Sequence, residues 1–470
     1  MKADNGCFVA YLLFLFLLPL PLGSNREWAW LAGAALVFAV AALLLWELAE
    51  GRLSWSPVFA ASRLVLVCLL AWLLFGLFQI LPLPSVLVGL LSPERLAWPL
   101  PWQGNSDWIT LSVTPGDSAL LWLQSLFFGM LFALTIQMVN TRKRVRRVLL
   151  VLVLAGVTQA LYGSFMTMSG VEWGFLQEKV HGRGVATGTY VNRNHLAGML
   201  VLCLCAGIGL LMSHMRSGVQ REGLRQRLRG WVRVVLGPRM RLRIYLGVMV
   251  VGLVLTHSRM GNASFFSALL IAGVLGLILM RSAPRPMIIL IASLLVVDIL
   301  IIGTWFGVEQ VVERIQETGA YQPSIGRYRD QDRLNVDTET LAAWHDYRWV
   351  GSGAGSFPVV FQRYRQPDLG SFFDHAHNDH LEFLLEFGLL GSLPLAFLFL
   401  ASMATALRAQ MQRRDPLMRA TGFAVTMAGI ATLIHSAVDF NLRIPANVAY
   451  LMVLMALAWV ARSLPTRSIN

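Results

Sequence analysis

Long apolar runs alternate along the chain with shorter polar segments, many of them basic. Runs of about 18 or more apolar residues predict transmembrane α-helices, because lipid cannot hydrogen-bond an exposed backbone. No small-x-small cleavage site follows the first run, so we expect a retained helix there. The sequence predicts an all-α polytopic membrane protein with twelve spans, near 8–22, 29–47, 59–81, 118–140, 148–168, 195–213, 244–257, 263–280, 287–306, 383–407, 420–438 and 444–462.

Charge gives the predicted spans a direction. The chain is 56% hydrophobic and 14% charged, with a formal net charge of +13. The basic residues cluster at 141–147, 216–243, 281–286, 408–419 and the C-terminus. All these clusters fall on one side when the spans are threaded alternately, and the positive-inside rule makes that side the cytoplasm, together with both termini. The positive charge is thereby explained without a nucleic-acid partner.

The spans divide the chain into four parts. Residues 1–140 hold the first four helices, and 141–306 hold the next five with a basic cytoplasmic loop at 214–243. Residues 307–380 form a large periplasmic loop between the ninth and tenth helices, and 381–470 hold the last three helices. The basic loop is also compatible with an amphipathic helix lying on anionic membrane lipids.

Three polar motifs precede spans that all run from the outside inwards. They are GTYVNRNHLAGML at 188–200, THSRMGNAS at 256–264 and HAHNDHLEFLLEFGLLG at 375–391. The N-terminus of a helix carries unpaired N–H groups and about half a positive charge, which together favour anions. Three such ends at one membrane surface predict a polyanionic ligand.

Two arginines strengthen this expectation. Arg193 and Arg259 stand beside the predicted starts of the sixth and eighth spans, where Asn194 and Asn262 are the expected N-caps. Guanidinium groups offer forked donors that match phosphate oxygens. The alternative for each arginine is contact with lipid headgroups or with a loop carboxylate.

The third motif places His375, His377 and His380 within six positions. One interpretation is a metal site completed by Asp374 or Asp379, and another is a structural cap at the helix start. We favour a third, in which His377 acts as a general base or stabilises a transition state, because an imidazole of pKa about 6.5 accepts a proton readily.

Acidic and polar residues nearby complete the candidate site. Glu382 and Glu386 share one helix face just inside the membrane, and we consider pairing with an arginine the better interpretation of them than direct catalysis. His435 and Asp439 lie one turn apart before FNLRIP, where they either shape the pocket or cap the helix. The residues expected to bind substrate are Asn192, Asn194, Asn378, Arg327, Glu382, His435 and Asp439.

The combined motifs resemble the bacterial O-antigen ligase family, which shares a domain with Wzy-type polysaccharide polymerases. The hallmark of a His-Asn pair, nine residues and G-x-x-G is reproduced by His377, Asn378, Gly388 and Gly391, whose glycines are spaced for close helix packing. YVNRNH and SRMG match the family's two arginine motifs, and GSGAGSF at 351–357 fits its large loop. The resemblance covers roughly residues 140–460, with the basic insertion at 214–243 as a departure.

The resemblance implies a metal-independent, inverting glycosyltransferase with a GT-C-like fold in the bacterial inner membrane. Its donor would be a glycan on undecaprenyl pyrophosphate, used at the periplasmic face without a cofactor. Arg193 and Arg259 would neutralise the leaving pyrophosphate, while His377 would orient or deprotonate the acceptor hydroxyl.

The acceptor remains open between several candidates. We favour O-antigen ligation to lipid A–core over Wzy-type extension of a lipid-linked repeat unit, and a protein serine or threonine hydroxyl is a third candidate. A lipid-linked sugar transporter or flippase is disfavoured, because transporters place charged sites near the bilayer midplane and often show inverted repeats.

Overall fold

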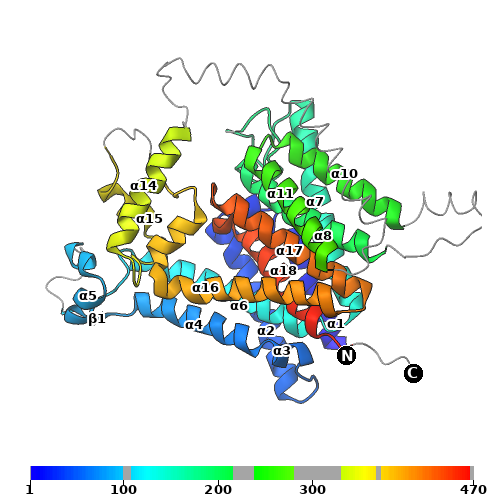
Figure 1. Ribbon diagram of the computed structural model, residues 1–470, viewed down its shortest axis with the longest axis horizontal. Helices are drawn as coiled ribbons and strands as arrows, with labels where there is room; N and C mark the ends of the chain where they lie inside the picture. Colours follow the sequence, from blue (N-terminus) through cyan, green and yellow to red (C-terminus); the bar gives the residue numbers. More distant parts are fainter. Residues whose placement is uncertain are drawn as a thin grey trace, which may run out of the picture.

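The structure is a computed structural model that describes residues 2–98, 107–180, 182–214, 238–279, 330–366 and 372–465 (Figure 1). This part of the chain is almost wholly helical. Its helices are long and apolar enough to cross a membrane, so the prediction of an all-α polytopic membrane protein is confirmed.

The predicted spans coincide with helices wherever the structure describes them. Two of these helices differ from the others. Helix α1 (Lys2–Leu17) is shorter, and α10 (Pro238–Leu255) carries arginines in its first turns. The span predicted at 287–306 lies outside the described residues. The helices that meet the length and hydropathy of a membrane span are α2 (Glu27–Ala49), α4 (Arg63–Ile80), α6 (Pro115–Met138), α7 (Arg142–Ser169), α8 (Arg193–Ser213), α11 (Arg259–Leu279), α16 (Asp379–Gln412), α17 (Pro416–Ser436) and α18 (Pro445–Ser463).

Short elements cover the ends of the bundle. Strands β1 (Leu83–Pro84) and β2 (Trp108–Ile109) pair antiparallel beside α5 (Ser85–Leu91). Helix α14 (Asp330–Asp346) lies within the predicted periplasmic loop, and the other short helices are α3 (Pro57–Ala61), α15 (Phe357–Val360), η1 (Leu22–Ser24), η2 (Pro93–Ala97), η3 (Phe361–Arg363) and η4 (Asn441–Arg443).

Helices α8, α17 and α18 form the centre of the bundle (Figure 1). In α8, 83% of the apolar window is buried inside the protein, against 17% in α4. Small residues allow this close packing: a Cβ on Gly209 of α8 would lie 2.9 Å from the Ala420 carbonyl oxygen of α17. Small residues at such contacts bring helix backbones together, which strengthens van der Waals packing within a membrane.

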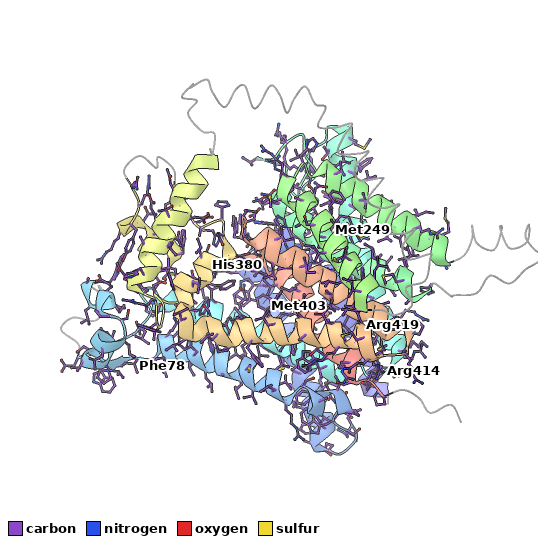
Figure 2. All side chains as sticks on the ribbon, in the orientation of Figure 1. Phe78, Met249, His380, Met403, Arg414 and Arg419 are labelled. Atoms are coloured by element: carbon purple, nitrogen blue, oxygen red, sulfur yellow. The ribbon has the colours of Figure 1, made fainter. Side chains whose placement is uncertain are left out.

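One end of the bundle is basic. Arg144 of α7 pairs with Asp4 of α1 at 2.6 Å, and Arg142 pairs with Asp415, the N-cap of α17, at 2.8 Å. These contacts bring the start of α1, the α6–α7 turn and the α16–α17 turn to one end, which we call the basic end. In Figure 2, Arg414 and Arg419 mark this end of α16 and α17, and His380 lies near the opposite end of α16.

Helix α16 is broken near its start, a feature that the apolar pattern of the sequence does not predict. Gly388 has φ 62° and ψ −172°, outside the helical region. The interrupted backbone pairs with the preceding loop instead: Leu389 N–H donates to the Arg348 carbonyl at 2.8 Å, and Gly353 N–H donates to the Glu386 carbonyl at 3.0 Å. The segment 347–353 therefore packs directly into the break.

The two glycines of the G-x-x-G motif serve different contacts. A Cβ on Gly388 would lie 2.5 Å from the Gly351 nitrogen, so this glycine faces a loop. Gly391 leaves no room for a Cβ against the Phe75 ring of α4. The expectation of close helix packing therefore holds for Gly391 and is wrong for Gly388, because the break turns Gly388 toward the loop.

Candidate functional site

The helix starts that carry the three polar motifs meet at the end opposite the basic end. Asn447 of α18 donates its side-chain N–H to the His195 carbonyl of α8 at 3.0 Å. The backbone N–H of Asp379, the first residue of α16, donates to the Asp439 carbonyl at 3.3 Å. We call this end, with the N-termini of α8, α11 and α16, the motif end.

Asparagine side chains cap the N-termini of two of these helices. The Asn192 side-chain oxygen accepts from the Asn194 N–H at 2.8 Å and caps α8, and the Asn378 side-chain oxygen accepts from Leu381 N–H at 3.3 Å and caps α16. Asn194 was expected as the cap of α8. That expectation is wrong by two residues, because the backbone is still extended at Asn192 and Asn194 already lies inside the helix.

The start of α11 is capped by a serine. Ser258 accepts from the Gly261 N–H through its hydroxyl at 3.1 Å. Asn262, the expected cap, instead donates its side-chain N–H back to the Ser258 carbonyl at 2.8 Å. The prediction at Asn262 is therefore wrong, since the helix begins at Arg259 and the residue lies in its first turn.

Arg193 and Arg259 are the first residues of α8 and α11, and both are exposed. His257 lies close to the starts of both helices. Burial and the nearby positive charge of Arg193 lower the pKa of His257, which stands two residues before Arg259. Two guanidinium groups thus flank two adjoining helix N-termini, an arrangement that favours a phosphate-bearing ligand.

Three imidazoles surround the ring of Phe440 at the motif end. The ring centroids lie 4.4 Å from His375, 4.9 Å from His377 and 4.6 Å from His195. His375 stacks on Phe440, while His377 and His195 meet it edge to face. Phe440 therefore fixes the separation of histidines that come from α8 and from the loop before α16.

His377 occupies a special backbone conformation. Its φ is 54°, the left-handed region that residues other than glycine adopt rarely. The side chain is half-buried, directly before the N-cap Asn378. An unfavourable backbone at this position is maintained by the surrounding contacts, a pattern common at functional sites.

A buried charge network holds the loop that carries His377. Glu382 accepts from the Ala376 N–H at 2.8 Å, contacts the His375 ring nitrogen at 2.8 Å and pairs with Arg443 at 3.0 Å. Arg443 also pairs with Glu386. Both glutamates are almost fully buried, so Arg443 compensates the charge of two carboxylates in the protein interior.

The network sets the protonation of its cations. Burial lowers the pKa of His375, but the Glu382 carboxylate raises it more, so the pKa of His375 lies above its usual value. Burial likewise lowers the pKa of Arg443, and the carboxylates of Glu386 and Glu382 raise it further than that. Arg443 was not singled out from the sequence, although a lone arginine in FNLRIP directly before an apolar helix is a usable signal.

Asp439 lies between two buried histidines. Its carboxylate oxygens are 3.8 Å from His195 Nε2 and 3.9 Å from His435 Nε2, beyond hydrogen-bonding distance. Asp439 also accepts from the Phe440 N–H at 2.8 Å, which fixes the start of the turn that carries Phe440. All of these groups except Phe440 are buried, so His435 and Asp439 sit behind the imidazoles nearer the surface.

His375 and His380 of the third motif have different polar partners. His380 Nε2 lies 3.1 Å from the Leu433 carbonyl of α17, while His375 contacts Glu382. In the described residues, no group of three His, Cys, Asp or Glu side chains is arranged to hold a metal ion. Arg327, the remaining predicted contact, lies outside the described residues.

Comparison with known proteins finds a family match over part of the chain. No curated protein matches the chain. Residues 244–396 match the model of the O-antigen ligase family, Wzy_C, and this segment holds Arg259, His377, Gly388 and Gly391. The matched segment supports a membrane glycosyltransferase of the O-antigen ligase or polymerase type.

Proposed function

We propose that this protein transfers a polysaccharide from undecaprenyl pyrophosphate to lipid A–core, and that the motif end is its active site. The observation that carries the proposal is the placement of His377 in the cluster around Phe440, at the same end as the arginine-bearing starts of α8 and α11. Such a transfer requires a group that accepts a proton and a positively charged site that binds the pyrophosphate.

The donor pyrophosphate would bind at Arg193 and Arg259. Both side chains are exposed, so they can reach a lipid phosphate at the membrane surface. As the bond from the sugar to the pyrophosphate breaks, negative charge builds on the leaving oxygen. Guanidinium groups and helix dipoles fixed in advance stabilise that charge without reorganising. We therefore propose a metal-independent reaction.

His377 would act on the acceptor. The acceptor hydroxyl oxygen attacks the anomeric carbon, its proton passes to the imidazole, and the pyrophosphate departs with the bonding electrons from the opposite face. A single displacement of this kind inverts the anomeric carbon. Glu382 supports the step as a positioning residue, because its bond to Ala376 N–H holds the backbone next to His377.

Orientation in the membrane follows from charge. Arg142, Arg144 and Arg414 lie at the basic end, and the positive-inside rule assigns that end to the cytoplasm. The motif end then faces the periplasm of a bacterial inner membrane, where lipid-linked glycans and lipid A–core are both available.

Polymerisation is the second candidate function, because the matched family includes Wzy-type enzymes. Its chemistry at the donor is the same, and only the acceptor differs. Transport of a lipid-linked sugar fits less well, because Arg193, Arg259 and His377 all sit at helix starts rather than at the middle of the spans.

A transfer assay separates these functions. Purified protein is given an undecaprenyl-pyrophosphate glycan with either lipid A–core or a second lipid-linked repeat, each with and without EDTA. Ligation predicts product on lipid A–core that persists in EDTA. Chain growth on the lipid-linked repeat alone would establish a polymerase, and loss of activity in EDTA would contradict the metal-independent reaction.

A further inference from the structure

A second feature of the motif end is a pocket beside the buried charge network. Its empty volume, including the open mouth, is about 620 Å³. It lies between the starts of α2 and α18, helix α6, the segment around α15 and the start of α16. Its lining includes the buried Glu382 and Glu386 and the partly buried His375 and Arg443. A volume of this order accommodates a small ligand such as one sugar unit.

The pocket is acidic. Glu27 and Asp374 line it together with Glu382 and Glu386, and the cationic side chains in the lining are those of Arg443 and His375. Arg443 is already paired with both buried glutamates, and His375 is paired with Glu382. Surplus carboxylate charge repels phosphate, so this pocket and the arginine-bearing helix starts select ligands of opposite character.

Polar groups remain available for a ligand. Among the described residues, no hydrogen bond or ion pair joins the side chains of Asn25, Glu27 or Gln124 to the rest of the protein, and all three line the pocket. Amide and carboxylate groups donate to and accept from sugar hydroxyls. Trp30 and Leu121 add apolar wall against which a sugar ring can pack.

The pocket also adjoins the proposed proton acceptor. His375 lines the pocket and stacks on Phe440 at 4.4 Å, and Phe440 also contacts His377, with the ring centroids 4.9 Å apart. A sugar held in the pocket therefore lies next to the imidazole cluster. Asn25, Glu27, Trp30 and Gln124 lie outside the family domain at 244–396, so the N-terminal helices supply this part of the lining.

We propose that this pocket is the acceptor subsite, and that it selects a neutral or amino-bearing sugar unit while excluding a phosphorylated one. The proposal rests on the proposed function, since only a transferase needs an acceptor. The same chemistry is met by a terminal sugar of lipid A–core and by a sugar of a lipid-linked repeat, so both acceptors enter the test.

The kinetic test uses the full-length protein with Gln124→Ala and Glu27→Gln. Loss of one hydrogen bond to the acceptor should raise its KM about fivefold in each variant, with the KM of the undecaprenyl-pyrophosphate donor unchanged. Glu50→Gln, on the exposed far end of α2, is the matched control and should leave both unchanged. A rise in donor KM, or no rise in acceptor KM on whichever acceptor is active, would overturn the proposal.

A binding test stands apart from catalysis. Saturation-transfer NMR on the protein in nanodiscs, with methyl glucoside, methyl glucosaminide and glucose 6-phosphate as probes, should show contact with the first two only. Gln124→Ala should weaken those contacts, and Arg193→Ala should not. Preference for glucose 6-phosphate, or contacts that are insensitive to Gln124→Ala, would overturn the subsite. If the predicted contacts appear in a protein that has no transfer activity, the pocket is a sugar-binding site but the proposed function is contradicted.

Discussion

His375 is a residue of the site whose protonation is coupled to an ion pair. Its ring contacts Glu382 at 2.8 Å, and that carboxylate raises the pKa of His375 above its usual value of 6.5 despite the lowering by burial. A histidine whose pKa is higher in the folded state stabilises the fold when protonated. That stabilisation is complete below about pH 6.5, the unfolded pKa, and is lost as pH rises through the folded pKa.

The variant His375→Gln should remove this dependence. We expect its unfolding temperature to fall furthest below that of the wild type at low pH, with the difference narrowing as pH rises above the folded pKa of His375. Thermal unfolding in detergent between about pH 5 and about pH 9 measures it. A difference that stays constant over this range would show that the pair contributes no proton-linked stability.

The residues of the candidate site differ in how far the sequence points to them. His377, Arg193 and Arg259 can be singled out because each stands in a polar motif at a helix start. The pairing of Glu382 with an arginine was expected, but its partner Arg443 lies on another helix start, and nothing local connects the two. A contact between residues so far apart in sequence depends on how the helices pack, which one sequence does not specify.

At the scale of elements, the spans were predictable and the break in α16 was not. Lipid requires a continuous apolar helix, so each span is visible in the hydropathy of its own residues. The break depends on a remote partner: the carbonyl groups at Arg348 and Trp349 accept the N–H groups of Leu389 and Leu390 that the break releases. The periodicity of apolar residues in α16 does not predict this contact with the loop.

Gly388→Ala tests the break directly. At φ 62° an alanine is strained, and its Cβ would lie 2.5 Å from the Gly351 nitrogen. We expect the free energy of unfolding to fall by about 1–3 kcal/mol. Transfer activity should also fall, because the break positions the loop and the start of α16. Gly247→Ala in α10 is the control, since a Cβ there meets nothing within 4 Å. Equal stability of both variants would mean that the break is not structurally required.

A periplasmic active site requires the motif end and the basic end of the bundle to face opposite sides of the membrane. Leu176, in the loop after α7, is 81% exposed at the motif end, and Arg414 is exposed at the basic end. In whole bacteria with a permeabilised outer membrane, a membrane-impermeant thiol reagent should label Leu176→Cys and spare Arg414→Cys. Cysteines Cys7, Cys203 and Cys205 are buried, and the unmodified protein controls for Cys68. The reverse labelling would invert the topology and remove the proposed site from the periplasm.

The proposed role of His377 is tested most directly by comparing His377→Ala with His380→Ala in a single-turnover transfer reaction. The two histidines stand three residues apart, but His377 contacts Phe440 in the imidazole cluster and His380 contacts the Leu433 carbonyl of α17. The rate to measure is the formation of glycan-bearing acceptor from a bound undecaprenyl-pyrophosphate donor. A general base contributes about 10²–10⁴-fold, so His377→Ala should lose activity on that scale while binding the donor normally, and His380→Ala should stay within a few-fold of the wild type. Full activity in His377→Ala would contradict the account.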